Sequence, residues 1–231
     1  MPEYALYLES GPKRRKTMVH VLGLLGCIAQ GPTTEAALDA APGAIRTYLR
    51  FLKRHGDAVE PAGAFTTAVA AHVTEGAWLG NGDPTPGFVP DFEPLPASEL
   101  AVLLRRLEWL GADLAEIAGG IAPGALNSRP ATGRSALAIL EHVAEAQGTY
   151  LRYTVGKVDN LREALNAVHE GDGLERALVR LWEVTIDRLD AIPEIERQRL
   201  IPHGQVTWTA RRGLRRMLEH GWEHLQELSA R

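Results

Sequence analysis

Apolar residues recur at helical spacing through most of residues 98–231. The repeats form four stretches, and each stretch places its apolar residues on one face of a helix of about five turns. Four amphipathic helices of this length predict a four-helix bundle. Their apolar stripes run over Leu100–Leu114, Ile139–Tyr153, Leu174–Leu189 and Leu214–Leu228.

Polar residues predict where several of these helices begin and end. Ser98 and Ser135 stand just ahead of the first and second stripes, and serine is a favoured N-cap residue. Asn160 and Glu163 have the spacing of a capping box, which predicts a short additional helix. The glycines at 171 and 173 are expected to end this short helix, because glycine readily adopts the backbone conformation of a C-terminal cap.

The N-terminal residues show a different pattern, in which short β-rich runs surround one helix. Thr33 is the predicted N-cap of this helix, whose apolar stripe runs from Ala37 to Leu52. A basic turn at residues 13–16 joins the first two β-rich runs. The predicted strands cover Tyr4–Leu8, Thr17–Leu22, Cys27–Gln30 and Phe65–Thr74.

Residues that break regular structure separate the two patterns. Residues 61–97 contain no Lys or Arg, and the stretch from Gly80 to Gly87 is rich in glycine and proline. We therefore expect an α+β chain with a small β/α domain at residues 1–76. A linker at 77–97 and the four-helix bundle at 98–231 complete the expected organisation.

Composition and charge exclude several classes of protein. The chain has 231 residues, of which 45% are hydrophobic and 23% charged, and this excludes a disordered chain. Its net charge of −4, without a strongly basic segment, argues against a nucleic-acid partner. The lone Cys27 excludes a disulfide within the chain and a zinc site built from several cysteines, and we interpret it as a small buried hydrophobe.

The sequence also bears on where the protein is found. The N-terminus carries an acid where a secretory signal needs basic residues, so no signal peptide is predicted. The longest apolar run, Val19 to Ala29, is interrupted by His20 and by glycines and is too short to cross a bilayer. We therefore expect a cytoplasmic protein without a membrane partner.

Eight histidines are spread over the chain, and His220 and His224 are four residues apart on the last predicted helix. This spacing places two imidazoles on one helix face, within reach of one ion. His142 lies on the stripe of the second helix, between Ile139 and Val143, so all three histidines are predicted to point inward. Taken alone, His142 fits a hydrogen-bonded core histidine. The pair alone fits a solvated helix face and a pair of metal ligands equally well.

Taken together, the three histidines favour a metal site in the bundle core. Three neutral imidazoles suit a divalent first-row metal, for which zinc is the default and nickel the alternative. Three protein ligands leave a coordination position for water or substrate, which is typical of catalytic zinc sites.

Residues 98–231 resemble the DinB-like superfamily, including the YfiT-type thiol transferases and the mycothiol-dependent maleylpyruvate isomerases. The resemblance rests on the stretches Arg134–Ala144 and Arg212–His224. In this family one histidine of the second helix and an H-x3-H pair of the last helix hold the metal. The resemblance therefore implies that His142, His220 and His224 are the ligands. It also implies that a low-molecular-weight thiol, mycothiol or bacillithiol, binds the metal and attacks an electrophile.

Residues 1–60 resemble a HicB-type domain, through Leu24–Ala37, Ala44–Ile45 and Tyr48–Leu49. HicB antitoxins carry a separate DNA-binding module, and nothing in this sequence resembles one. The resemblance therefore implies a sensing, docking or dimerisation role for this domain. If the role is dimerisation, we expect the protein to form a homodimer.

The residues around the ligands suggest further roles. Glu145, one turn after His142, is the candidate catalytic base, and a solvated flank residue is the alternative interpretation. Glu141, Glu219 and Glu223 stand next to the candidate ligands in the sequence and are expected to face away from the core. Tyr150, Tyr153 and Trp208 are candidates for the wall of a substrate pocket, or for plain core residues.

The favoured function is a metal-dependent enzyme, specifically a thiol S-transferase or isomerase whose partners are a small thiol and an electrophile. A metal-stabilised binding or stress-response module without turnover is the alternative outside the enzymes. Metal-assisted hydrolysis is the alternative among them.

Overall fold

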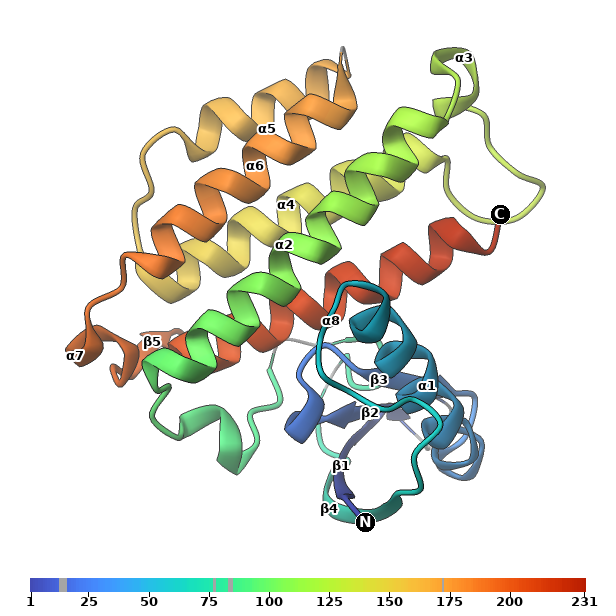
Figure 1. The fold of residues 1–231 in the computed structure, drawn as a ribbon, viewed down its shortest axis with the longest axis vertical. Helices are drawn as coiled ribbons and strands as arrows, with labels where there is room; N and C mark the ends of the chain where they lie inside the picture. Colours follow the sequence, from blue (N-terminus) through green and yellow to red (C-terminus); the bar gives the residue numbers. More distant parts are fainter. Residues whose placement is uncertain (13–15, 77, 83–84, 172) are drawn as a thin grey trace. The chain divides into compact units, whose positions relative to one another are not determined.

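The computed structural model describes residues 1–12, 16–76, 78–82, 85–171 and 173–231 (Figure 1). The chain forms two compact units, which are described separately. The first unit contains Met1–Glu93 together with Gly204–Thr207, and the second contains Pro94–His203 and Trp208–Arg231. A β-sheet near the N-terminus is followed by a series of helices, and this confirms the predicted α+β class.

The first unit is built on a sheet with the strand order β3-β2-β1-β4. The pairs β1–β2 and β2–β3 are antiparallel, whereas β4 runs parallel to β1. The helix α1 connects β3 to β4 and packs against β2 and β3. The elements are β1 (Glu3–Ser10), β2 (Thr17–Val21), the 3-10 turn η2 (Leu22–Leu24), β3 (Ile28–Gly31), α1 (Thr34–Arg54), β4 (Thr66–Val73) and the 3-10 turn η3 (Val89–Phe92).

The local features of this unit follow the sequence pattern. Thr33 caps α1 as predicted, since its hydroxyl accepts a hydrogen bond from the Ala36 backbone N–H at 3.1 Å. Cys27 is fully buried, as expected for a small hydrophobe. A basic turn is predicted at residues 13–16, but residues 13–15 lie outside the described part of the chain.

The second unit is a helical assembly in which α2, α4, α6 and α8 run alongside one another (Figure 1). The helix α8 packs against α4 and α2, and α2 also packs against α6. Their contact faces are lined by the predicted apolar stripes, for example by Leu107, Ile139 and Leu214, each of which is fully buried. The elements are α2 (Ala97–Gly120), α3 (Pro123–Leu126), α4 (Ala136–Val155), α5 (Leu161–Glu170), α6 (Leu174–Asp190), α7 (Glu194–Arg197), β5 (Ile201–His203) and α8 (Ala210–Ser229). The short strand β6 (Val206–Trp208) lies at the boundary, since Val206 and Thr207 belong to the first unit and Trp208 to the second.

The helix starts show where the capping predictions succeed and fail. Ser135 caps α4 as predicted, accepting from the Ala138 N–H at 3.2 Å. Ser98 is not an N-cap, because α2 already begins at Ala97 and Ser98 lies within its first turn. The capping box at Asn160 is also wrong: the backbone of Asn160 is left-handed, with φ of 62°, and its side chain makes no capping hydrogen bond. An N-cap side chain reaches the helix from an extended backbone, so this conformation removes the box.

Two glycines let α8 approach its neighbours closely. A Cβ atom on Gly213 would lie 1.8 Å from Thr154 Oγ1 of α4, and one on Gly221 would lie 2.6 Å from Leu110 Cδ2 of α2. These distances are far below van der Waals contact, so a larger residue at Gly213 would displace Thr154 or push α8 away from α4, and one at Gly221 would displace the end of the Leu110 side chain. The close approach of α8 to α4 sets the position of the histidines that follow Gly213 on α8.

Candidate metal centre

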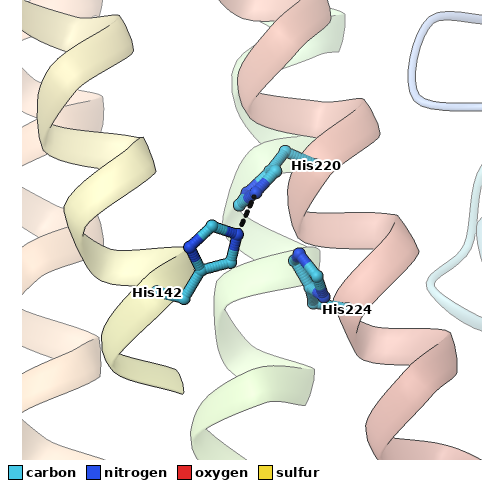
Figure 2. Close-up of side chains that lie close together, drawn as sticks. All are labelled: His142, His220 and His224. Carbon is cyan, nitrogen blue, oxygen red and sulfur yellow. Dashed lines mark hydrogen bonds between the residues drawn. The ribbon is translucent and has the colours of Figure 1, made fainter. Parts of the chain in front are cut away.

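Three histidines from two helices meet on one side of α8. His142 projects from α4 toward His220 and His224, which lie one turn apart on α8 (Figure 2). One ring nitrogen from each residue can be chosen so that all three lie within 4.8 Å of one another. The Nε2 atoms of His142 and His220 are 3.0 Å apart and share a hydrogen bond. The structure thus brings together the three histidines that the sequence analysis singled out.

The cluster opens toward solvent on the α4 side. His224 is buried, His220 is half-buried and His142 is exposed. His142 faces the other two histidines as predicted but is exposed rather than buried, and it stands at the edge of the buried stripe of α4 beside Val143. The exposure of His142 leaves one member of the cluster accessible from solvent.

The environment keeps two of these imidazoles neutral at neutral pH. Desolvation by the packed helices lowers the pKa of His220 well below its ordinary value, and the charges of His224 and Arg216 lower it further. Partial desolvation, together with the charges of His224 and Arg134, also lowers the pKa of His142. Since a metal ion binds the unprotonated ring nitrogen, these sites do not have to release protons at pH 7 before they bind.

The donor set fits a divalent ion. Imidazole nitrogens about 2.0–2.1 Å from a tetrahedral zinc lie about 3.3 Å from one another. The 3.0 Å between the His142 and His220 nitrogens is close to that spacing. The wider separations in the cluster call for small side-chain rotations, and the exposed His142 has room for them.

A charged pair holds the outer side of His224. Its Nδ1 atom lies 2.7 Å from Glu227 Oε2 and 3.3 Å from an Arg134 guanidinium nitrogen. The same guanidinium nitrogen donates to Glu227 Oε2 at 2.9 Å. Burial by itself would raise the pKa of Glu227, but the hydrogen bond from His224 and the Arg134 charge outweigh it, so that the pKa is lowered.

Glu227 and Arg134 were not predicted from the sequence. The i, i+3 spacing of His224 and Glu227 was a usable signal, since residues three apart face each other on a helix. Arg134 is 90 residues from His224, and no local pattern links them.

Three aromatic side chains pack in a row beside the histidine cluster. The Tyr150 ring lies 6.0 Å from the His220 ring and 5.7 Å from Trp208, and Trp208 in turn lies 5.1 Å from Tyr153. The buried Arg216 guanidinium sits 5.6 Å from the centre of the Tyr150 ring. Of the three aromatic residues singled out from sequence, Tyr150 is thus the one in contact with a histidine of the cluster.

One acidic residue on α8 is placed differently from expectation. Glu219 is buried, with 1% exposure, rather than turned away from the core. It accepts hydrogen bonds at 3.0 Å from Arg215 and from Arg216, which are buried as well. The two arginines compensate its charge, and this is what allows a carboxylate inside the fold.

Glu145 lies one turn along α4 from His142 but outside the cluster. Its Oε1 atom forms a hydrogen bond of 2.6 Å with His169 Nε2, which ties α4 to α5. The side chain of Glu145 is 51% exposed. Its assignment as the catalytic base stays a prediction.

The His169–Glu145 contact predicts a pH-dependent contribution to stability. The hydrogen bond to Glu145 raises the pKa of His169, and the neighbouring Glu141 adds to the effect. Because the pKa of His169 is higher in the folded state than in the unfolded state, the contact stabilises the fold. This stabilisation is fully present at a pH below the pKa of the unfolded state, about 6.5, and is lost as the pH rises through the pKa of the folded state.

We therefore expect His169→Ala to lower the free energy of unfolding more at pH 6 than at pH 9. The difference should be about 0.5 kcal/mol, because the pair is largely solvated. Urea denaturation in the presence of a chelator measures it. A difference of zero, or one of opposite sign, would show that the ion pair does not form in solution.

The fold and the cluster together define a helical unit with a three-histidine candidate metal centre. Residues 106–228 match the model of the DinB superfamily, and the chain belongs to this superfamily. No curated protein and no solved structure matches the chain. Within the described part of the chain, none of the helices combines the length and the apolar character that crossing a bilayer requires.

Proposed function

We propose that His142, His220 and His224 hold one divalent metal ion and that the protein is a metal-dependent enzyme. The observation that carries the proposal is the convergence of three imidazole nitrogens within 4.8 Å on two helices of a DinB-superfamily unit. Metal binding is common among members of this superfamily. Zinc is the proposed ion because three neutral nitrogen donors suit it, and nickel is the alternative.

The open side of the cluster supports catalysis rather than a purely structural role. Structural zinc sites are usually closed by four protein ligands, whereas catalytic sites keep a position for water or substrate. Here the described residues offer three ligands, and the exposed His142 marks the side from which a substrate would approach. A divalent ion in such a site supplies Lewis acidity and favours the ionised form of a bound water or thiol.

The proposed reaction is the attack of a low-molecular-weight thiol, mycothiol or bacillithiol, on an electrophile. The outcome is either transfer of the thiol to the electrophile or thiol-dependent isomerisation of the electrophile. The resemblance of Arg134–Ala144 and Arg212–His224 to the YfiT-type transferases and the maleylpyruvate isomerases supports this choice. Tyr150, beside His220, would contact the bound substrate, and Glu145 is the proposed base. The first unit, with its resemblance to a HicB-type domain, is proposed to serve in sensing, docking or formation of a homodimer.

A thiol-conjugation assay tests the proposed function. Purified protein is loaded with zinc and incubated with a bimane halide and, in separate reactions, mycothiol, bacillithiol or glutathione. We expect catalysed conjugate formation with mycothiol or bacillithiol, and its loss in the His220→Ala variant. Bound metal without turnover of any thiol would favour the binding module, and ester hydrolysis without a thiol would favour the hydrolase.

A further inference from the structure

A carboxylate lies against the outer ring nitrogen of His224. Glu227 Oε2 lies 2.7 Å from His224 Nδ1, one turn further along α8. At neutral pH a carboxylate only accepts hydrogen bonds, so a contact this short needs a proton on Nδ1. With Nδ1 unprotonated, two lone pairs would face each other at 2.7 Å.

Arg134 strengthens this assignment rather than competing with it. A guanidinium only donates, and the Arg134 nitrogen within 3.3 Å of His224 Nδ1 has a better acceptor in Glu227 Oε2, at 2.9 Å. The Nδ1–H of His224 therefore donates to Glu227, and Arg134 donates to the same carboxylate oxygen. In a neutral imidazole that leaves Nε2 as the unprotonated nitrogen.

We propose that Glu227 and Arg134 are positioning residues that fix the tautomer and orientation of His224, so that its Nε2 lone pair faces His142 and His220. A carboxylate behind a ligating histidine has this effect in many metalloproteins, because the hydrogen bond fixes the ring and raises its basicity. The inference rests on the proposed metal site for its consequence, but the tautomer itself is a property of the protein without metal.

The same residues join the two helices that carry the ligands. Arg134 directly precedes Ser135, the N-cap of α4, and Glu227 lies in the last turn of α8. A second contact reinforces the link, since Arg231 donates to the Arg134 carbonyl oxygen at 2.7 Å. Glu227 thus holds His224 from α8 while Arg134 ties that arrangement to the start of the helix that bears His142.

The tautomer can be read from the imidazole nitrogen shifts of the metal-free protein at pH 8. Long-range proton–nitrogen correlation spectra should show His224 with its proton on Nδ1. In Glu227→Ala the proton should move toward Nε2, the form that free histidine side chains favour in water. Glu227→Gln retains an acceptor oxygen and should give a smaller change. Glu116→Gln, an equal charge change at an exposed position of α2, serves as the control and should leave His224 unchanged.

Zinc affinity, measured by competition with a chromogenic chelator, gives the second readout. We expect Glu227→Ala to weaken binding about 10- to 100-fold, with a smaller loss in Glu227→Gln and none in Glu116→Gln. A wild-type His224 protonated on Nε2, or unchanged nitrogen shifts in Glu227→Ala, would overturn the positioning role.

The nitrogen shifts and the zinc affinity test the positioning role of Glu227 and the proposed metal site separately. The expected tautomer in a protein that binds no metal would refute the proposed metal site while supporting the arrangement of His224. Normal zinc binding together with the wrong tautomer would refute the positioning role alone.

Discussion

Replacing His220 with alanine is expected to lower the zinc affinity by at least about 100-fold. The His220 ring contacts both other rings of the cluster, with ring centres 4.8 Å from His142 and 4.5 Å from His224. Its removal leaves two imidazoles, and loss of a direct ligand costs more than the roughly 10- to 100-fold typical of a residue behind a ligand. Titration calorimetry or chelator competition measures the change.

A histidine outside the cluster provides the matched control for this experiment. His169 lies on α5, in contact with Glu145, and its replacement by alanine should leave zinc affinity and stoichiometry unchanged. Wild-type affinity in the His220→Ala variant would show that the ion binds elsewhere or not at all.

Replacing Gly213 with alanine is expected to lower the free energy of unfolding by about 1–3 kcal/mol. The new methyl group would lie 1.8 Å from Thr154 Oγ1 and 3.0 Å from Thr154 Cβ, so either Thr154 gives up its hydrogen bond to the Tyr150 carbonyl or α8 and α4 move apart. An alanine within a helix is otherwise more favourable than glycine by about 1 kcal/mol, which makes a net loss diagnostic of the close packing. Urea denaturation of the metal-free protein measures the change in free energy.

Gly120 offers the corresponding control, because it ends α2 and a methyl group added there would meet no atom within 4 Å. Gly120→Ala should be neutral or slightly stabilising. Equal stabilities of Gly213→Ala and the wild type would contradict the close contact between α8 and α4. If the variant is destabilised but folded, its zinc affinity should also fall, since the same two helices carry the ligands.

The parts of the fold that sequence predicted well are those with a strong local signal. Long apolar stripes at helical spacing locate α2, α4, α6 and α8, because burial of one helix face requires that pattern. The caps at Thr33 and Ser135 depend on residues three positions apart, and the structure confirms both. The strands β5 and β6 have three residues each, too few for any periodicity to show.

The features that were mispredicted depend on tertiary context. Asn160 does stand at the N-cap position of α5, but its backbone is left-handed and its side chain makes no capping hydrogen bond, which the residue type alone does not reveal. Glu219 is buried because Arg215 and Arg216 are buried with it, and a single carboxylate in the sequence carries no sign of that compensation. The exposure of His142 likewise depends on where the packed face of α4 ends.

In the candidate site, too, some features have a local sequence signal and others depend on the folded chain. The i, i+4 spacing of His220 and His224 and the position of His142 on its stripe are local features of the sequence, and they were sufficient to predict the cluster. The pairing of Arg134 with Glu227 joins residues 93 positions apart, so only the folded chain reveals it.

Anomalous diffraction from crystals of the zinc-loaded protein, recorded on both sides of the zinc absorption edge, tests the central claim most directly. The difference map locates the ion without any assumption about its ligands. We predict one anomalous peak per chain, about 2.0–2.1 Å from a ring nitrogen of each of His142, His220 and His224, with Nε2 as the ligand atom of His224. A peak bound to other residues, or no peak at the cluster in crystals grown with excess zinc, would contradict the assignment.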